Sequence, residues 1–152
     1  MDQEKAKQRA LAFLKENDTM VIATASKSGE PQASTVYYVV DNDFNVFFIT
    51  NAGTKKHDNL TKNNQVAFVV GFGPQVLTVQ GGGIAQEMAE GYEQVYGQIM
   101  EKALKPADQW PPLFLSKKGQ CVFKITPSWM VCLNLHKESH EAGVQEDFCK
   151  II

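Results

Sequence analysis

The spacing of hydrophobic and polar residues divides the chain into helical and extended segments. Apolar residues recur every three or four positions from Gln3 to Asn17, which predicts an amphipathic helix. A second helical pattern runs from Glu87 to Leu104 and stops before Pro106. Short, strongly apolar runs predict strands at residues 19–25, 32–40, 45–50, 65–70 and 74–81, and two more at 120–126 and 129–135 around Pro127.

The links between the first strands are short and rich in turn-forming residues. The segments SKSGEP (26–31) and DNDF (41–44) have the Gly, Pro, Asn and Asp content of hairpin turns, which join antiparallel strands. The runs VYYVV (36–40) and VFFI (46–49) are apolar at successive positions, so both faces of the sheet must be covered. We therefore expect a small antiparallel barrel of the α+β class, and a homodimer that covers the second face.

Composition excludes several classes of partner. A chain of 152 residues fits one domain (1–152), and its net charge of −2 gives no bulk attraction to nucleic acid or to anionic membranes. The three cysteines are far apart and lack the CxxC spacing, and no apolar run reaches the length of a membrane span. These features lead us to expect a cytoplasmic protein. We assign no helix or strand to the polar tail, 136–152.

The segment ITNAGTKKHDNL (49–60) carries the strongest candidate chemistry. A short helix is expected to begin near Thr54, and two lysines, Lys55 and Lys56, stand in its first turn, where cations oppose the helix dipole. Unpaired backbone N–H groups, a hydroxyl and two ammonium groups are together the parts of a phosphate site. A solvated surface helix, whose lysines extend into water, is an equally good interpretation of the spacing.

Several segments in order resemble the FMN-binding split barrels related to pyridoxamine 5′-phosphate oxidase. The match includes T50-N51-A52-G53-T54-K55-K56, which resembles the FMN-phosphate turn of that family, followed by N63-N64-Q65-V66-A67 and, more approximately, by Q75-V76-L77-T78-V79-Q80-G81. The resemblance covers residues 8–85 well and the FKITPSWMVCL segment (123–133) more loosely.

The resemblance implies a six- to seven-stranded split β-barrel with flanking helices, of the α+β class and mainly antiparallel β. It also implies a homodimer with FMN at the subunit interface and a flavin-dependent oxidoreductase activity on an unidentified small molecule. The implied cofactor-binding residues are Ser34, Thr35, Val36, Ile49, Thr50, Thr54, Lys55, Lys56 and Gln75. No residue is assigned as a catalytic acid or base. Trp110 or Trp129 of the partner could cover the flavin ring, although we favour ordinary core packing for both.

The chain also departs from that family. Ser34 and Val39 stand where the oxidases have an arginine and a lysine that hold cofactor phosphate, and Arg9 is the single arginine of the sequence. We therefore do not expect the vitamin-B6 phosphate ester as the substrate. Two alternatives remain open: a protein that binds FMN or haem without turnover, and a reductase that uses a deazaflavin.

Other candidate sites give weaker signals. His136 and His140 have a spacing that suits one helix face and metal binding, but the acidic, non-periodic surroundings favour a solvated tail, and we predict no metal site. His57 is interpreted as a surface residue or, alternatively, as an acid–base group. The run Gly81-Gly82-Gly83 lacks the context of a phosphate loop and predicts a bulge or a close backbone approach near the end of the fifth strand.

Overall fold

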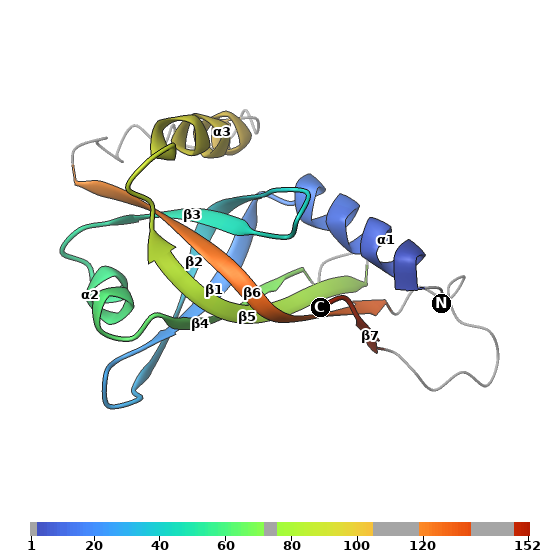
Figure 1. The fold of residues 1–152 in the computed structure, drawn as a ribbon, viewed down its shortest axis with the longest axis horizontal. Coiled ribbons are helices and arrows are strands. Elements are labelled where there is room, and N and C mark those ends of the chain that lie inside the picture. Colours follow the sequence, from blue (N-terminus) through green and yellow to red (C-terminus); the bar gives the residue numbers. More distant parts are fainter. Residues whose placement is uncertain (1–2, 72–75, 105–118, 135–147) are drawn as a thin grey trace.

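A computed structural model describes residues 3–71, 76–104, 119–134 and 148–152 (Figure 1). The helices are α1 (Gln3–Glu16), α2 (Lys55–Lys62) and α3 (Tyr92–Leu104). The strands are β1 (Thr19–Ala25), β2 (Pro31–Val40), β3 (Val46–Asn51), β4 (Gln65–Val70), β5 (Leu77–Glu87), β6 (Gln120–Asn134) and β7 (Phe148–Lys150). None of the described helices is long and apolar enough to cross a membrane.

The strands form one antiparallel sheet that closes on itself. Their order is β3-β2-β1-β4-β5-β6-β7, and β3 also pairs with β6, so that β1 to β6 make a closed barrel while β7 adds to the outer edge of β6. Closure satisfies the backbone groups that an open sheet would leave exposed at its edges. The predicted α+β, mainly antiparallel barrel with flanking helices is confirmed.

The hydrophobic core fills the barrel and extends beneath α1. Tyr38 and Phe48, from β2 and β3, are fully buried, and Leu14 of α1 packs with them. The Tyr38 hydroxyl donates a hydrogen bond to the Leu14 carbonyl, and burial raises the pKa of this phenol well above its usual value. Successive residues of these strands are apolar because one face of the sheet lines the barrel interior and the helices cover part of the other face.

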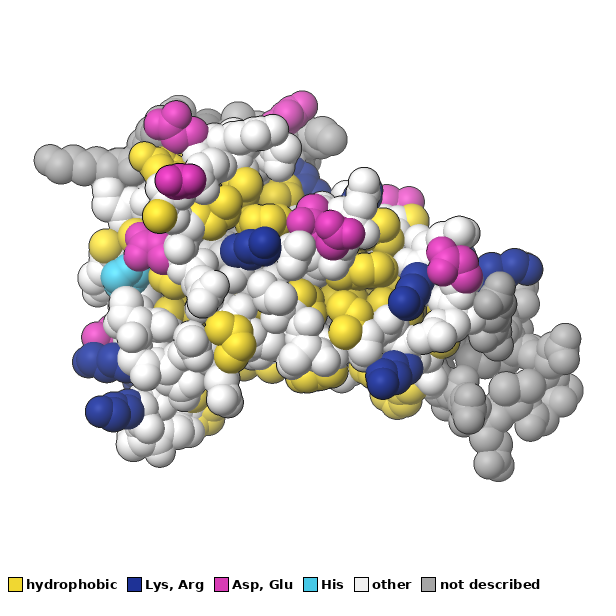
Figure 2. All heavy atoms as spheres, in the orientation of Figure 1, with side chains coloured by type: hydrophobic (Ala, Val, Ile, Leu, Met, Phe, Trp, Pro, Cys, Tyr) yellow, Lys and Arg dark blue, Asp and Glu magenta, His cyan; other side chains and the backbone are white. Residues whose placement is uncertain are grey.

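Each helix has its own place on the barrel. α1 contacts β2 and β7, α2 contacts β1 and β3, and α3 contacts β2, β3 and β6. Hydrophobic side chains gather between α3 and the barrel on the face drawn in Figure 2, while lysine and arginine side chains are scattered over that face. The arrangement leaves α2 and α3 near the same end of β3, which is where the candidate site lies.

The glycine run lies inside a longer strand than the sequence predicted. β5 spans Leu77–Glu87 instead of 74–81, and its pairing with β6 shifts register between Gly82 and Gly83. A side chain at Gly83 would begin 2.1 Å from the Thr126 carbonyl oxygen. The predicted bulge and close approach are thus confirmed, but they occur in mid-strand, because glycine lets the backbones of β5 and β6 come together.

Pro127 does not separate two strands, as the sequence suggested. β6 runs without interruption from Gln120 to Asn134, and Pro127 lies opposite Gly83 at the bulge. Proline has no N–H group to donate to the ladder, and a bulge is a position where that donor is not required.

Two further element boundaries differ from the sequence prediction. α3 begins at Tyr92 rather than Glu87, since β5 continues to Glu87 and Gly91 then adopts a left-handed conformation (φ 72°). The last residues, to which the sequence assigned no element, form β7 and anchor Ile151, which is buried and donates its backbone N–H to Met130. Residues 136–147 of the predicted tail lie outside the described residues.

Candidate functional site

A tight turn after β3 positions the N-terminus of α2. Gly53 adopts a left-handed conformation (φ 87°), and the Thr54 N–H bonds to the Asn51 carbonyl. Thr54 is the N-cap: its Oγ1 accepts a hydrogen bond from the His57 N–H and donates one to the Asn51 carbonyl at 2.8 Å. The first helical bond joins the Asp58 N–H to the Thr54 carbonyl, so the N–H groups of Lys55 and Lys56 precede it. The predicted start of this helix near Thr54 is confirmed.

α2 is fixed to the barrel despite its single large apolar side chain. Leu60 is buried, and the Asn59 side chain, only 2% exposed, donates a hydrogen bond to Thr24 Oγ1 of β1 at 3.1 Å. A buried amide that has a partner contributes to stability, whereas an unpartnered one costs about 1–3 kcal/mol. The first turn of α2 is therefore held in a defined place relative to β1 and β3.

A cavity of about 250 Å³ lies beside this turn, between β2, β3, α2 and α3. Six of the nine residues that the family resemblance implied line it: Thr35, Val36, Ile49, Thr50, Thr54 and Lys56. The other described residues that line it are Tyr37, Asn51, Ile99 and Met100. The cavity thus has an apolar wall from the strands and α3, and a polar end at the first turn of α2.

The two adjacent lysines have different environments. Lys56 lines the cavity and is half-buried, and its partial burial lowers the pKa of its ammonium group. Lys55 is exposed and forms an ion pair with Glu30 at 3.4 Å. The pair that the sequence treats as equivalent therefore presents one lysine to the cavity and the other to solvent.

Of the other implied residues, Ser34 and Lys55 are not among the described residues of this lining. Ser34 is half-buried on β2 and pairs with Ile22 of β1, and Gln75 lies outside the described residues. Ile99 and Met100 line the cavity although the sequence assigned them no site role. Their helical spacing was apparent, but periodicity does not tell which strands a helix covers.

Trp129 is not a core residue, contrary to the interpretation that we favoured. Its side chain is 42% exposed on β6, and its indole nitrogen would lie 2.5 Å from a side chain built at Gly82. The indole therefore packs against Gly82, where the lack of a side chain leaves room for it on the outside of the barrel. Trp110, His136 and His140 lie outside the described residues.

Known protein structures share this fold at low sequence identity. The conserved hypothetical protein Rv2991 from Mycobacterium tuberculosis superposes with a TM-score of 0.71 and 20% identity, covering 88% of each chain. A Listeria innocua protein named after pyridoxamine 5′-phosphate oxidase gives 0.64 and 17%, covering 82% of this chain and 94% of its own. HutZ, the haem storage protein of Vibrio cholerae, gives 0.62 and 18%, covering 80% and 89%. No curated protein sequence matches the chain.

The family itself is established by sequence. The profile described as pyridoxamine 5′-phosphate oxidase matches residues 6–131, which include β1 to β5, all but the last three residues of β6, the turn before α2 and all the described residues of the cavity lining. The chain therefore belongs to the pyridoxamine 5′-phosphate oxidase-like family.

Proposed function

We propose that this protein binds FMN in the cavity between β2, β3, α2 and α3, with the phosphate at the N-terminus of α2. The observation that carries the proposal is the junction of two environments in one cavity, a half-buried lysine at a helix N-terminus and an apolar wall. FMN has the same two parts, a phosphate dianion and a large flat ring.

The polar end of the cavity fits a phosphate group. The N–H groups of Lys55 and Lys56 precede the first helical bond, and the Lys56 ammonium adds a full positive charge beside them. Thr54 contributes indirectly, because its hydroxyl already donates to Asn51 and caps His57, which shapes the turn. A bound phosphate dianion would also interact favourably with the positive end of the α2 dipole. Without a bound anion, the two lysines oppose that dipole.

The apolar wall fits the edge and face of a flavin ring. Val36, Ile49 and Met100 supply hydrophobic surface, and Thr50 adds a hydroxyl that lies 3.3 Å from Thr54 Oγ1. Cofactor sites are commonly built in this way, with mostly apolar linings and a few placed polar groups.

We further propose that the protein is a flavin-dependent oxidoreductase acting on a small molecule. When bound, FMN would supply the transfer of electrons or hydride, and the protein's residues would orient the reactants and exclude water. Among the described lining residues there is no carboxylate, histidine or cysteine, so their contribution is binding and orientation.

A test of this function begins with the released cofactor. The purified protein is expected to be yellow, to release FMN on denaturation and to lose its flavin absorbance when NADH or NADPH is added under anaerobic conditions. A colourless protein that fails to bind added FMN would contradict the cofactor proposal. If the protein binds FMN but reduces no substrate with either a nicotinamide or a chemical electron donor, it is an FMN carrier without enzymatic turnover.

Haem is the second candidate, favoured by the similarity to the haem storage protein of Vibrio cholerae. The described lining offers Tyr37 and Met100 as side chains able to ligate iron, but a half-buried lysine suits a phosphate better. An intense Soret band in the purified protein would favour haem, and a released deazaflavin would favour a deazaflavin-dependent reductase.

We also propose that two copies pair through the outer face of the barrel. Val21, Ile84 and Trp129 are large apolar residues exposed there, and Val21 and Trp129 line a shallow apolar depression of about 340 Å³ with residues of β4 and β5. A contiguous exposed apolar surface of this kind is typical of an interaction site. Light scattering should give twice the chain mass, and Trp129→Lys should yield monomers. A monomeric wild-type protein at micromolar concentration would contradict the pairing.

A further inference from the structure

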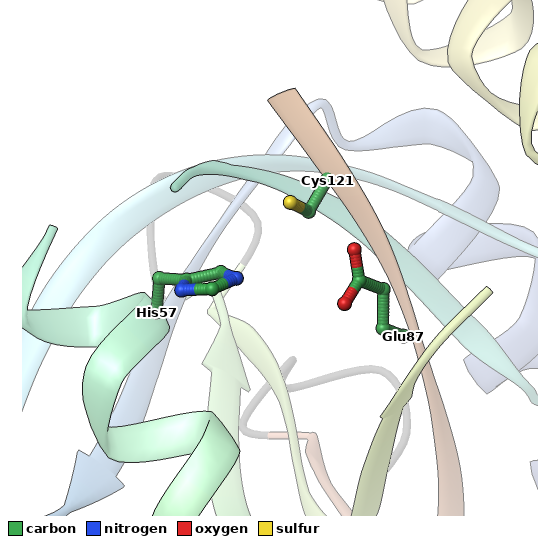
Figure 3. A group of neighbouring side chains, drawn as sticks. All are labelled: His57, Glu87 and Cys121. Carbon is green, nitrogen blue, oxygen red and sulfur yellow. The ribbon is translucent and has the colours of Figure 1, made fainter. Parts of the chain in front are cut away.

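Three potential metal ligands converge at the end of the barrel next to the first turn of α2. They are His57 of α2, Glu87 at the end of β5 and Cys121 near the start of β6. One ligand atom from each lies within 4.8 Å of the other two. Figure 3 shows the three side chains pointing toward one another from these separate elements.

The barrel fixes the positions from which these side chains extend. Cys121 pairs with Thr50 across β3 and β6, and Glu87 pairs with Phe123 across β5 and β6. The His57 N–H is capped by Thr54, and its ring meets the Phe123 ring edge-on with centroids 6.0 Å apart. The convergence therefore follows from strand register and helix capping, with His57 oriented by an aromatic neighbour.

We propose that His57, Glu87 and Cys121 form a binding site for a thiophilic divalent cation, of which Zn²⁺ is the best fit. An imidazole nitrogen, a carboxylate oxygen and a thiolate sulfur are the ligand types that zinc takes in proteins. A site that includes sulfur disfavours Mg²⁺ and Ca²⁺, which prefer oxygen ligands. The proposal is independent of FMN, since none of the three residues lines the cofactor cavity.

The geometry allows a cation to bind with small side-chain movements. Tetrahedral bonds of 2.0–2.3 Å place ligand atoms roughly 3.5 Å apart, so ligand atoms that lie within 4.8 Å of one another must approach by about 1.3 Å at most. Glu87 is exposed and can rotate without disturbing the core. Three protein ligands leave a fourth position for water or an external ligand. Glu87 also borders an open depression of about 580 Å³, lined with α2 and β5 residues, through which such a ligand can enter.

A cysteine nucleophile is the competing interpretation of these residues. Activated cysteines have a lowered thiol pKa. Burial, together with the hydrogen bond and negative charge of Glu87, instead raises the pKa of the Cys121 thiol to about 11. The Glu87 carboxylate therefore disfavours a free Cys121 thiolate. With a cation bound between them, both negative groups are stabilised, because the cation attracts each of them.

The test uses the full chain, stripped with a chelator and titrated with Zn²⁺ and Co²⁺. We expect one ion per chain by calorimetry, and the ultraviolet charge-transfer absorption of a cobalt–thiolate bond. Cys121→Ser should abolish that absorption, and Cys121→Ser or His57→Gln should weaken Zn²⁺ binding more than 10-fold, as expected when a ligand is lost. Cys149→Ser removes a half-buried thiol outside the cluster and should change neither signal.

Circular dichroism and thermal melting of each variant distinguish ligand loss from unfolding. The proposal is overturned if the wild-type protein binds no Zn²⁺ at micromolar concentration, or if folded Cys121→Ser binds it as tightly as the wild type. Equal losses in Cys121→Ser and Cys149→Ser would also overturn it. FMN binding should survive in Cys121→Ser, so failure of this proposal and failure of the FMN proposal give different results.

Discussion

Lys56→Ala should weaken FMN binding by roughly 10- to 150-fold and leave riboflavin binding almost unchanged. This range corresponds to the loss of a hydrogen bond to a charged group, about 1.5–3 kcal/mol. Lys56 lines the cavity at its polar end, and riboflavin lacks the phosphate that the ammonium would contact. Fluorescence titration of the two flavins against the cofactor-free protein measures both affinities.

Lys55→Ala is the matched control for this prediction. Lys55 is exposed, and its ion pair with Glu30 is a surface contact, which typically contributes 0–1 kcal/mol. FMN affinity should therefore fall by less than about fivefold. Equal losses from the two substitutions, or a comparable loss for riboflavin, would show that Lys56 does not contact the phosphate.

The same contact predicts a pH dependence. Burial lowers the pKa of Lys56, so its ammonium form is lost at a lower pH than that of an exposed lysine. Because the phosphate binds the protonated form, FMN binding takes up a proton once Lys56 is neutral, and the apparent FMN affinity falls as the pH rises through this lowered pKa. Riboflavin binding should not follow that fall. Lys56→Arg should extend the preference for FMN to higher pH, because arginine stays charged.

The contrast between the two lysines marks the limit of sequence reasoning at the candidate site. The segment around Thr54 could be recognised because a strand, a turn, a capping residue and cations are all local features. Which lysine faces the cavity depends on how α2 is rotated against β1, and the hydrogen bond from Asn59 to Thr24 helps to set that rotation. Such a contact, between residues distant along the chain, has no local signal.

The strands could be predicted wherever the apolar pattern of the sequence coincides with the residues that pair in the sheet. Alternating and continuous apolar runs gave β1 to β4 with small errors at their ends. The early end expected for β5 and the break expected within β6 have one cause, the bulge at Gly83, since glycine and proline usually end strands and here lie opposite each other within a long pair. The cluster of His57, Glu87 and Cys121 could not be predicted, because it depends on that register and on β3 pairing with β6.

Gly83→Ala should destabilise the protein by at least about 3 kcal/mol, the upper end of the cost of overpacking a well-packed site. The new methyl carbon would lie 2.1 Å from the Thr126 carbonyl oxygen and 2.8 Å from Pro127 Cα, and both neighbours are backbone atoms that a side-chain rotation cannot move aside. In a domain of this size the melting temperature should fall by roughly 6–12 °C.

Gly97→Ala provides the opposite expectation from the same chemical change. Gly97 is exposed within α3 and a methyl group there meets no atom within 4 Å, so the better helix propensity of alanine should stabilise the protein by about 0.5–1 kcal/mol. Urea denaturation of the two variants compares their free energies of unfolding directly.

If Gly83→Ala were as stable as the wild type, β5 and β6 could not be in such close contact at the bulge. The register that brings Glu87 next to Cys121 would then be wrong as well, which makes this stability measurement a test of the proposed metal site.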